Sequence, residues 1–135
     1  MKRKVVIWVN AVILLIVSKY LRGSSIEGRS FLRKFISKTN AILFRLAFKS
    51  YLTDYSNGFR IYNNKAANLI LNKKIRYSTP IYLGEVLIHW IKMNLQIVEL
   101  PGKYVNRTKG NSEIRCQDIL EGFQGYFRVI FDFYL

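Results

Sequence analysis

The chain has little of the chemistry on which metal sites and disulfide frameworks depend. Its 135 residues include one cysteine, Cys116, and one histidine, His89. A lone cysteine excludes an internal disulfide framework, and the two residues are too few for a Cys/His metal site. Acidic residues are also scarce, because 8 of them stand against 22 basic residues and leave a formal net charge of +14. This imbalance calls for nucleic acid, anionic lipid headgroups or a phosphorylated small molecule as partner.

Segment boundaries are equally scarce. No repeat, low-complexity stretch or Pro/Gly/Ser linker interrupts the sequence, so we expect a single domain over residues 1–135. Half of the residues are apolar and 15% are aromatic, which is typical of a folded domain that can lie against a membrane.

The N-terminus mimics a signal peptide, because "MKRK" precedes the apolar run "VVIWVNAVILLIV". No small-x-small cleavage pattern follows, and residues 5–17 are fewer than the ~20 that a membrane-spanning helix needs. We therefore favour a buried strand over residues 11–18, with residues 1–12 as its lead-in, and keep a cleaved signal and a membrane anchor as alternatives.

The rest of the sequence alternates between helical and strand patterns. After the loop "YLRGSSIEG", Ser30 is placed to cap a helix that runs to about residue 48. Then come the strand "GFRIYN", the helix "KAANLILNKK", the helix "LGEVLIHWIKMN" and the strand "LQIVELP". The inner side of the third helix is predicted to carry Val86, Leu87, Trp90 and Ile91. This alternation predicts an α/β fold.

An amphipathic helix is predicted over residues 115–135. Its apolar residues fall on one broad face: Ile119, Leu120, Phe123, Phe127, Ile130, Phe131 and Tyr134. With Arg115 and Arg128 beside it, this face fits a membrane interface, but a core-facing helix or a contact with a missing partner fits equally. Nucleic acid is disfavoured as a partner, because the aromatic residues recur at helical spacing and no zinc-finger, helix-turn-helix or RNP-type pattern is present.

Dispersed cations form the first candidate site. Lys19 ends a strand, Arg33 and Ser37 lie four residues apart on one helix face, and Arg107 and Lys109 follow another strand. Because ligands of α/β sheets bind at the carboxyl ends of strands, these side chains could converge on a phosphate. The alternative is that 22 basic residues are scattered over every solvated face.

Two further segments allow more than one interpretation. In "LTDYSNGFR", Asp54 and Arg60 could pair or orient a ligand, or Asp54 could accept nearby backbone N–H groups in an Asx-type turn. In "YVNRTKGNS", Asn106 begins an N-x-T triplet, which matters only if the loop enters a secretory lumen.

Four segments in order resemble the second half of the family 2 glycosyltransferases of GT-A fold, in the dolichyl- and polyprenyl-phosphate branch. They cover residues 13–120: "IVSKYLRGSSIEG", "GRSFLRKFIS" with its Arg-x-x-x-Ser spacing, "LTDYSNGFRIYN", and "YLGEVLIHWIKMNLQIVELPGKYVNRTKGNS" with Glu-x-Pro and Arg-x-x-Gly-x-Ser. The resemblance implies transfer of a sugar from a nucleotide-diphosphate sugar to a polyprenyl or dolichyl phosphate at the cytoplasmic face of a membrane.

The resemblance also implies roles for individual residues. Matches to phosphate-binding positions are Arg33, Ser37 and Arg107, with Lys109 in the same loop, and Lys19 stands where the branch usually has arginine. Matches to the segment beneath the acceptor are Asp54 and Arg60, and Glu85 matches the acid that opens a helix.

One departure from the family is large. The family holds Mg²⁺ or Mn²⁺ through an Asp-x-Asp motif, but the first acidic residue here is Glu27, so no such motif precedes Lys19. We therefore expect a partial GT-A (Rossmann-like) domain that lacks its N-terminal nucleotide-binding half and has no metal ligands. It would be a gene fragment, the product of a truncated reading frame, or one partner of a split enzyme whose other partner is the N-terminal half. Two alternatives remain: a family 2 transferase for a glycan or cell-wall acceptor, and a non-catalytic basic module that binds membrane surfaces.

Overall fold

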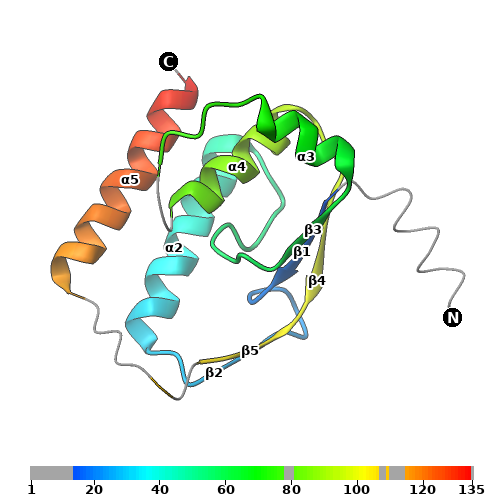
Figure 1. Ribbon diagram of the computed structural model, residues 1–135. Helices are drawn as coiled ribbons and strands as arrows, with labels where there is room; N and C mark the ends of the chain where they lie inside the picture. Colours follow the sequence, from blue (N-terminus) through cyan, green and yellow to red (C-terminus); the bar gives the residue numbers. More distant parts are fainter. Residues whose placement is uncertain (1–13, 78–80, 107–108, 110–114, 135) are drawn as a thin grey trace, which may run out of the picture.

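The computed structural model describes residues 14–77, 81–106, 109 and 115–134. In this part of the chain four helices and five strands form a small mixed α/β domain (Figure 1). The elements are β1 (Leu14–Ser18), β2 (Ser25–Glu27), α2 (Phe31–Phe48), β3 (Arg60–Tyr62), α3 (Asn64–Leu71), α4 (Ile81–Lys92), β4 (Ile97–Pro101), β5 (Lys103–Val105) and α5 (Cys116–Tyr134).

The strand β1 is the centre of the larger sheet, whose order is β3-β1-β4. It runs antiparallel to β3 and parallel to β4, with Leu14 opposite Ile97 and Ser18 opposite Pro101. Because β1 and β4 are parallel, their carboxyl ends meet at one edge of the sheet. The side chains that follow Ser18 are therefore brought close to those that end β4.

The helices pack to one side of this sheet (Figure 1). Ser30 caps α2 as expected, because its side chain accepts the backbone N–H of Arg33. Phe44 of α2 is fully buried, and its ring centroid lies 5.1 Å from that of Tyr55 and 4.9 Å from that of Tyr126 of α5. These aromatic contacts join α2, α5 and the segment before β3 into one core.

The predicted elements within the described residues are confirmed, but two strands were missed. The segments expected to be loops contain β2 and β5, which pair in parallel with Ser25 opposite Lys103 and Glu27 opposite Val105. Each has three residues, too few to show an alternating pattern, and their pairing depends on chain segments far apart in sequence. The segment "YVNRTKGNS" therefore begins as a strand.

Two sequence predictions have other outcomes. Residues 1–13, which include the predicted lead-in and the start of the predicted strand, lie outside the described residues. On α4, Leu87 and Trp90 are buried as predicted, while Val86 and Ile91 are half-buried. Of the helices that the structure describes, none has the length and apolarity needed to cross a membrane.

The apolar face predicted for the last helix is divided in the structure. Tyr126 and Val129 make the buried side of α5. Of the predicted face, three residues are half-buried and four are exposed; the exposed ones are Leu120, Phe127, Phe131 and Tyr134. The core therefore uses only one edge of the predicted face, where Ile130 packs against it beside Tyr126 and Val129.

Candidate anion-binding site

A pocket of about 370 Å³ opens at the carboxyl end of β1. Its lining residues are Val17, Lys19, Asn57, Phe59, Gly102, Lys103 and Tyr104. The absence of a side chain at Gly102 is necessary here, since a Cβ atom would lie 2.2 Å from Cγ1 of Val17. The turn between β4 and β5 can therefore pass close to β1 and form one wall of the pocket.

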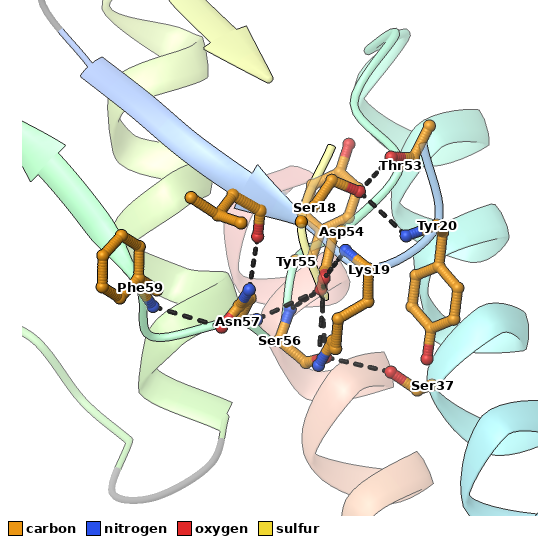
Figure 2. A network of polar contacts seen from close by, with 12 residues as sticks. Ser18, Lys19, Tyr20, Ser37, Thr53, Asp54, Tyr55, Ser56, Asn57 and Phe59 are labelled. Atoms are coloured by element: carbon orange, nitrogen blue, oxygen red, sulfur yellow. Dashed lines mark hydrogen bonds and ion pairs between the residues drawn. The ribbon is translucent and has the colours of Figure 1, made fainter. Parts of the chain in front are cut away.

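Asp54 organises the turn on another side of the pocket (Figure 2). Its carboxylate is fully buried, and Oδ1 accepts the backbone N–H groups of Ser56 and Asn57, each at 3.1 Å. Its Oδ2 accepts the backbone N–H of Lys19 at 3.0 Å. Asp54 thus makes the Asx-type turn that the sequence allowed, and it also ties this turn to the end of β1.

The ammonium group of Lys19 lies beside side-chain oxygen atoms of the turn between α2 and β3 (Figure 2). Its Nζ is 3.8 Å from Oδ2 of Asp54 and donates to Oγ of Ser56 at 3.4 Å. The hydroxyl of Ser56 is in turn 2.9 Å from that of Ser37 on α2. The structure therefore brings together three residues predicted for the site: Lys19, Ser37 and Asp54.

Lys19 is nearly buried beside the carboxylate of Asp54 and close to a second cation, Arg29. Only 8% of the residue is exposed, and burial lowers the pKa of Lys19 against the opposing effect of Asp54, with Arg29 lowering it further. The ring of Tyr104 contacts both cations, with its centroid 5.4 Å from Nζ of Lys19 and 5.7 Å from Cζ of Arg29. A bound anion would reduce the repulsion between these cations.

A second, half-buried carboxylate supports the first. Glu99 of β4 accepts the backbone N–H groups of Thr53 at 2.9 Å and Asp54 at 3.1 Å, so it holds the start of the turn. Burial raises the pKa of Glu99, while these hydrogen bonds lower it. Its place near the carboxyl end of β4, beside β1, was a usable sequence signal.

Three residues near the pocket were not predicted from the sequence: Arg29, Ser56 and Tyr104. Arg29 and Tyr104 belong to or adjoin the short strands β2 and β5, which the sequence does not reveal. Ser56 lies two residues after Asp54, and its position in an Asx turn was the available signal.

Among the described residues Arg60 forms no ion pair with Asp54, and it contacts backbone carbonyl groups instead. Its guanidinium donates to the carbonyl groups of Asn57 at 2.9 Å, Leu83 at 2.8 Å and Tyr55 at 3.0 Å. Burial lowers the pKa of Arg60 to about 10, so it remains charged at neutral pH. Arg60 therefore holds the turn against the start of α4.

Glu85 lies in a separate arrangement. Its buried carboxylate accepts the backbone N–H groups of Arg76 at 2.9 Å and Tyr77 at 3.1 Å. It orders the segment before α4 and does not line the pocket.

The remaining predicted residues have different positions. Arg33 is half-buried one turn before Ser37 on α2, and Lys109 is exposed. Arg107, together with Gly110, lies outside the described residues.

Asn106 has a structural contact that bears on the N-x-T triplet. Its Nδ2 donates to the carbonyl of Gly28 at 2.9 Å, and its backbone N–H donates to the carbonyl of Glu27 at 3.0 Å. Since N-glycosylation modifies the same Nδ2 atom, a glycan would disrupt this contact beside the β2–β5 pair.

The metal site implied by the resemblance does not fit the described residues. They contain no group of three or more His, Cys, Asp or Glu side chains that could hold a metal ion. Asp54 and Glu99, which support the turn beside the pocket, are directed to backbone N–H groups, and Glu27 pairs with Lys103 of the pocket wall at 2.8 Å.

The arrangement can bind an anion by charge and hydrogen bonding. Lys19 lines the pocket and supplies a positive charge, while the hydroxyls of Ser56 and Ser37 lie behind it, outside the lining, with Ser56 bonded to its Nζ. The buried carboxylate of Asp54 and the half-buried one of Glu99 keep these groups in place without lining the pocket. No known protein-family model matches the chain.

Proposed function

We propose that the pocket at the end of β1 binds the phosphate of a polyprenyl or dolichyl phosphate, and that the chain is the acceptor half of a family 2 glycosyltransferase of GT-A fold. The observation that carries this proposal is the nearly buried ammonium of Lys19, held beside the hydroxyls of Ser37 and Ser56. The net charge of +14 and the order of the four sequence segments support it further.

The reaction would need charge stabilisation more than a general base. An oxygen of the lipid phosphate would form a bond to the anomeric carbon of a nucleotide-diphosphate sugar, while the bond from that carbon to the nucleotide diphosphate breaks. Because the attacking phosphate is already anionic, Lys19 and the two hydroxyls would position it and offset its charge. The nucleotide-sugar and its Mg²⁺ or Mn²⁺ would be held by an N-terminal half, and the assembly would work at the cytoplasmic face of a membrane.

Calorimetric titration with geranyl phosphate, a short water-soluble isoprenyl phosphate, tests the proposal. Geraniol carries the isoprenyl group without the phosphate, and inorganic phosphate lacks the isoprenyl group. Titration with these two ligands separates the contributions of the two parts of geranyl phosphate. We expect Lys19→Gln to weaken binding of geranyl phosphate about tenfold or more, and Lys19→Arg to retain most of it. Lys49→Gln, at the far end of α2, is the control and should bind as the wild type does. Equal affinity for geraniol and geranyl phosphate would contradict the proposal.

A second titration tests whether the chain is only the acceptor half. The isolated chain should bind nucleotide-diphosphate sugars no better with Mg²⁺ or Mn²⁺ than without. Tight metal-dependent binding would show that a nucleotide site is present and would overturn this part of the proposal.

A further inference from the structure

The solvent-facing side of α2 carries two pairs of exposed apolar residues, one near each end of the helix. Phe31, Phe35, Ile42 and Leu46 are all exposed, and their spacing of four, seven and four residues places them on one stripe of the helix. Phe31 is 83% exposed and Phe35 is 58% exposed, and their rings stack with centroids 6.5 Å apart. We call these four residues the α2 stripe.

The α2 stripe is not needed by the core. The buried residues of α2 are Asn40, Ala41 and Phe44, which lie on the opposite side of the helix from the stripe. Exposed aromatic and aliphatic side chains aligned on one helix face are uncommon on a protein that works free in water, and they mark an interaction surface.

The charges of α2 indicate what the surface meets. The helix contains Arg33, Lys34, Lys38 and Arg45 and has no acidic residue. Lys34, Lys38 and Arg45 follow one edge of the α2 stripe by their helical spacing, and none of the three forms an ion pair among the described residues. An apolar stripe with a basic edge is the pattern of a helix that lies in the headgroup region of an anionic bilayer.

We propose that the α2 stripe docks this protein on an anionic lipid bilayer, with its aromatic rings at the acyl boundary and Lys34, Lys38 and Arg45 against the lipid phosphates. The face of α2 that carries Ser37 is a different one, so docking and anion binding use separate surfaces. The proposal therefore holds whether or not the pocket binds a polyprenyl phosphate.

The helix α5 offers an internal comparison. It also exposes an apolar stripe, in which Phe127 is 57% exposed and Phe131 is 64% exposed. Its sequence, however, contains Asp118, Glu121 and Asp132 against the single Arg128, so its charge opposes an anionic surface. The sequence left a membrane interface as one of several equal interpretations of α5, whereas exposure and charge together favour α2.

Co-sedimentation with phosphatidylcholine vesicles, with and without about one third phosphatidylglycerol, tests the proposal on the full chain. The wild type should bind the anionic vesicles much more strongly than the neutral ones. Phe31→Ser/Phe35→Ser should lower the partition coefficient on anionic vesicles about tenfold or more. The matched variant Phe127→Ser/Phe131→Ser should change it less than about twofold. Circular dichroism of each variant checks that exposed substitutions leave the fold intact.

The basic edge is tested separately. Lys34→Gln/Lys38→Gln should lower binding to anionic vesicles about tenfold, and Lys73→Gln/Lys74→Gln, two exposed lysines after α3, should lower it much less. Lys19→Gln should leave vesicle binding unchanged, which separates this proposal from that of the phosphate pocket.

Several outcomes would overturn the proposal. They are no binding to anionic vesicles, an equal loss in the α2 and α5 variants, and binding that is the same on neutral vesicles. Loss of self-association, or of oligonucleotide binding, in Phe31→Ser/Phe35→Ser without any vesicle binding would also overturn it, because the stripe would then serve another partner.

Discussion

Two regions of the molecule are organised around a buried carboxylate, and only one of them has the properties of a binding site. Asp54 and Glu85 both accept two or more backbone N–H groups and hold a segment that lacks regular secondary structure. Asp54 also lies 3.8 Å from the ammonium of Lys19, beside an open pocket. Among the described residues Glu85 has no such ion pair and lines no pocket.

The difference separates a structural device from a candidate site. A buried carboxylate that satisfies backbone N–H groups is a way to fix a turn, and it needs no ligand. At Asp54 one carboxylate accepts three backbone N–H groups and also lies 3.8 Å from the ammonium of Lys19, which lines the pocket. That ammonium is the group that a phosphate would contact.

The largest expected effect is the loss of a carboxylate charge. Asp54→Asn should destabilise the protein by about 3–5 kcal/mol, because it leaves the buried Lys19 without its partner. Glu85→Gln should lower the free energy of unfolding by about 1–3 kcal/mol. It weakens hydrogen bonds to backbone groups but leaves no buried cation without its partner. Urea unfolding monitored by circular dichroism measures both. If both variants lost the same free energy of unfolding, the proposed difference between the Asp54 and Glu85 regions would be contradicted.

A smaller effect is expected from the glycine that shapes the pocket. Gly102→Ala should destabilise the protein by about 1–3 kcal/mol, because the new Cβ would meet Val17 at 2.2 Å. Gly58→Ala is the matched control, since a Cβ there has open space, and it should change stability by less than about 0.5 kcal/mol. If Gly102→Ala is as well tolerated as the control, the pocket wall is more adaptable than its contacts indicate.

The pH dependence of anion binding should distinguish the Asp54 region further. Because the pKa of Lys19 is lowered from 10.5, chiefly by burial, the ammonium loses its proton at a lower pH than an exposed lysine. Affinity for geranyl phosphate should therefore fall as the pH rises through that pKa, toward the affinity of Lys19→Gln. Lys19→Arg should keep its affinity over the same range. A wild-type affinity that stays constant up to pH 10.5 would contradict a role for Lys19.

The smallest expected effect is a pH dependence of stability in the Glu85 region. Here the loss occurs as the pH falls, whereas the affinity of the Asp54 region is lost as the pH rises. Burial lowers the pKa of His89 below 6.5, against the opposing effect of Glu85, so the unfolded chain takes up the proton first as the pH falls. The free energy of unfolding should thus be highest above about pH 6.5 and decrease as the pH falls through the folded pKa. His89→Gln should flatten this dependence in urea unfolding at several pH values. If the free energy of unfolding of His89→Gln decreased more steeply at acid pH than that of the wild type, this prediction would be contradicted.

The sequence predicts much of the fold, because its helices and longer strands carry local signals. Ser30 before an apolar run gave the start of α2, and "LQIVELP" gave β4. The strands β2 and β5 could not be predicted, because three residues carry no period and their pairing is decided by where β1 and β4 bring the chain.

The site was predictable in part for a similar reason. Lys19 and Asp54 stand next to strand ends, where an α/β fold gathers functional side chains. That Arg60 bonds backbone carbonyls and Glu85 orders a loop depends on side-chain directions that spacing does not specify. The outward orientation of the α2 stripe was hidden because periodicity gives a face but not the side to which that face turns.

The parallel pairing of β1 with β4 also sets the order in which the molecule can mature. During synthesis β1 leaves the ribosome early, but its partner Ile97–Pro101 follows only after all the intervening helices α2, α3 and α4. Until then Glu99 cannot hold the turn, and Lys19 has no fixed environment. Contacts between segments so distant in sequence form slowly, so we expect helix formation to precede closure of the pocket during refolding. The capacity to bind an anion would then be the last property that the folding chain acquires.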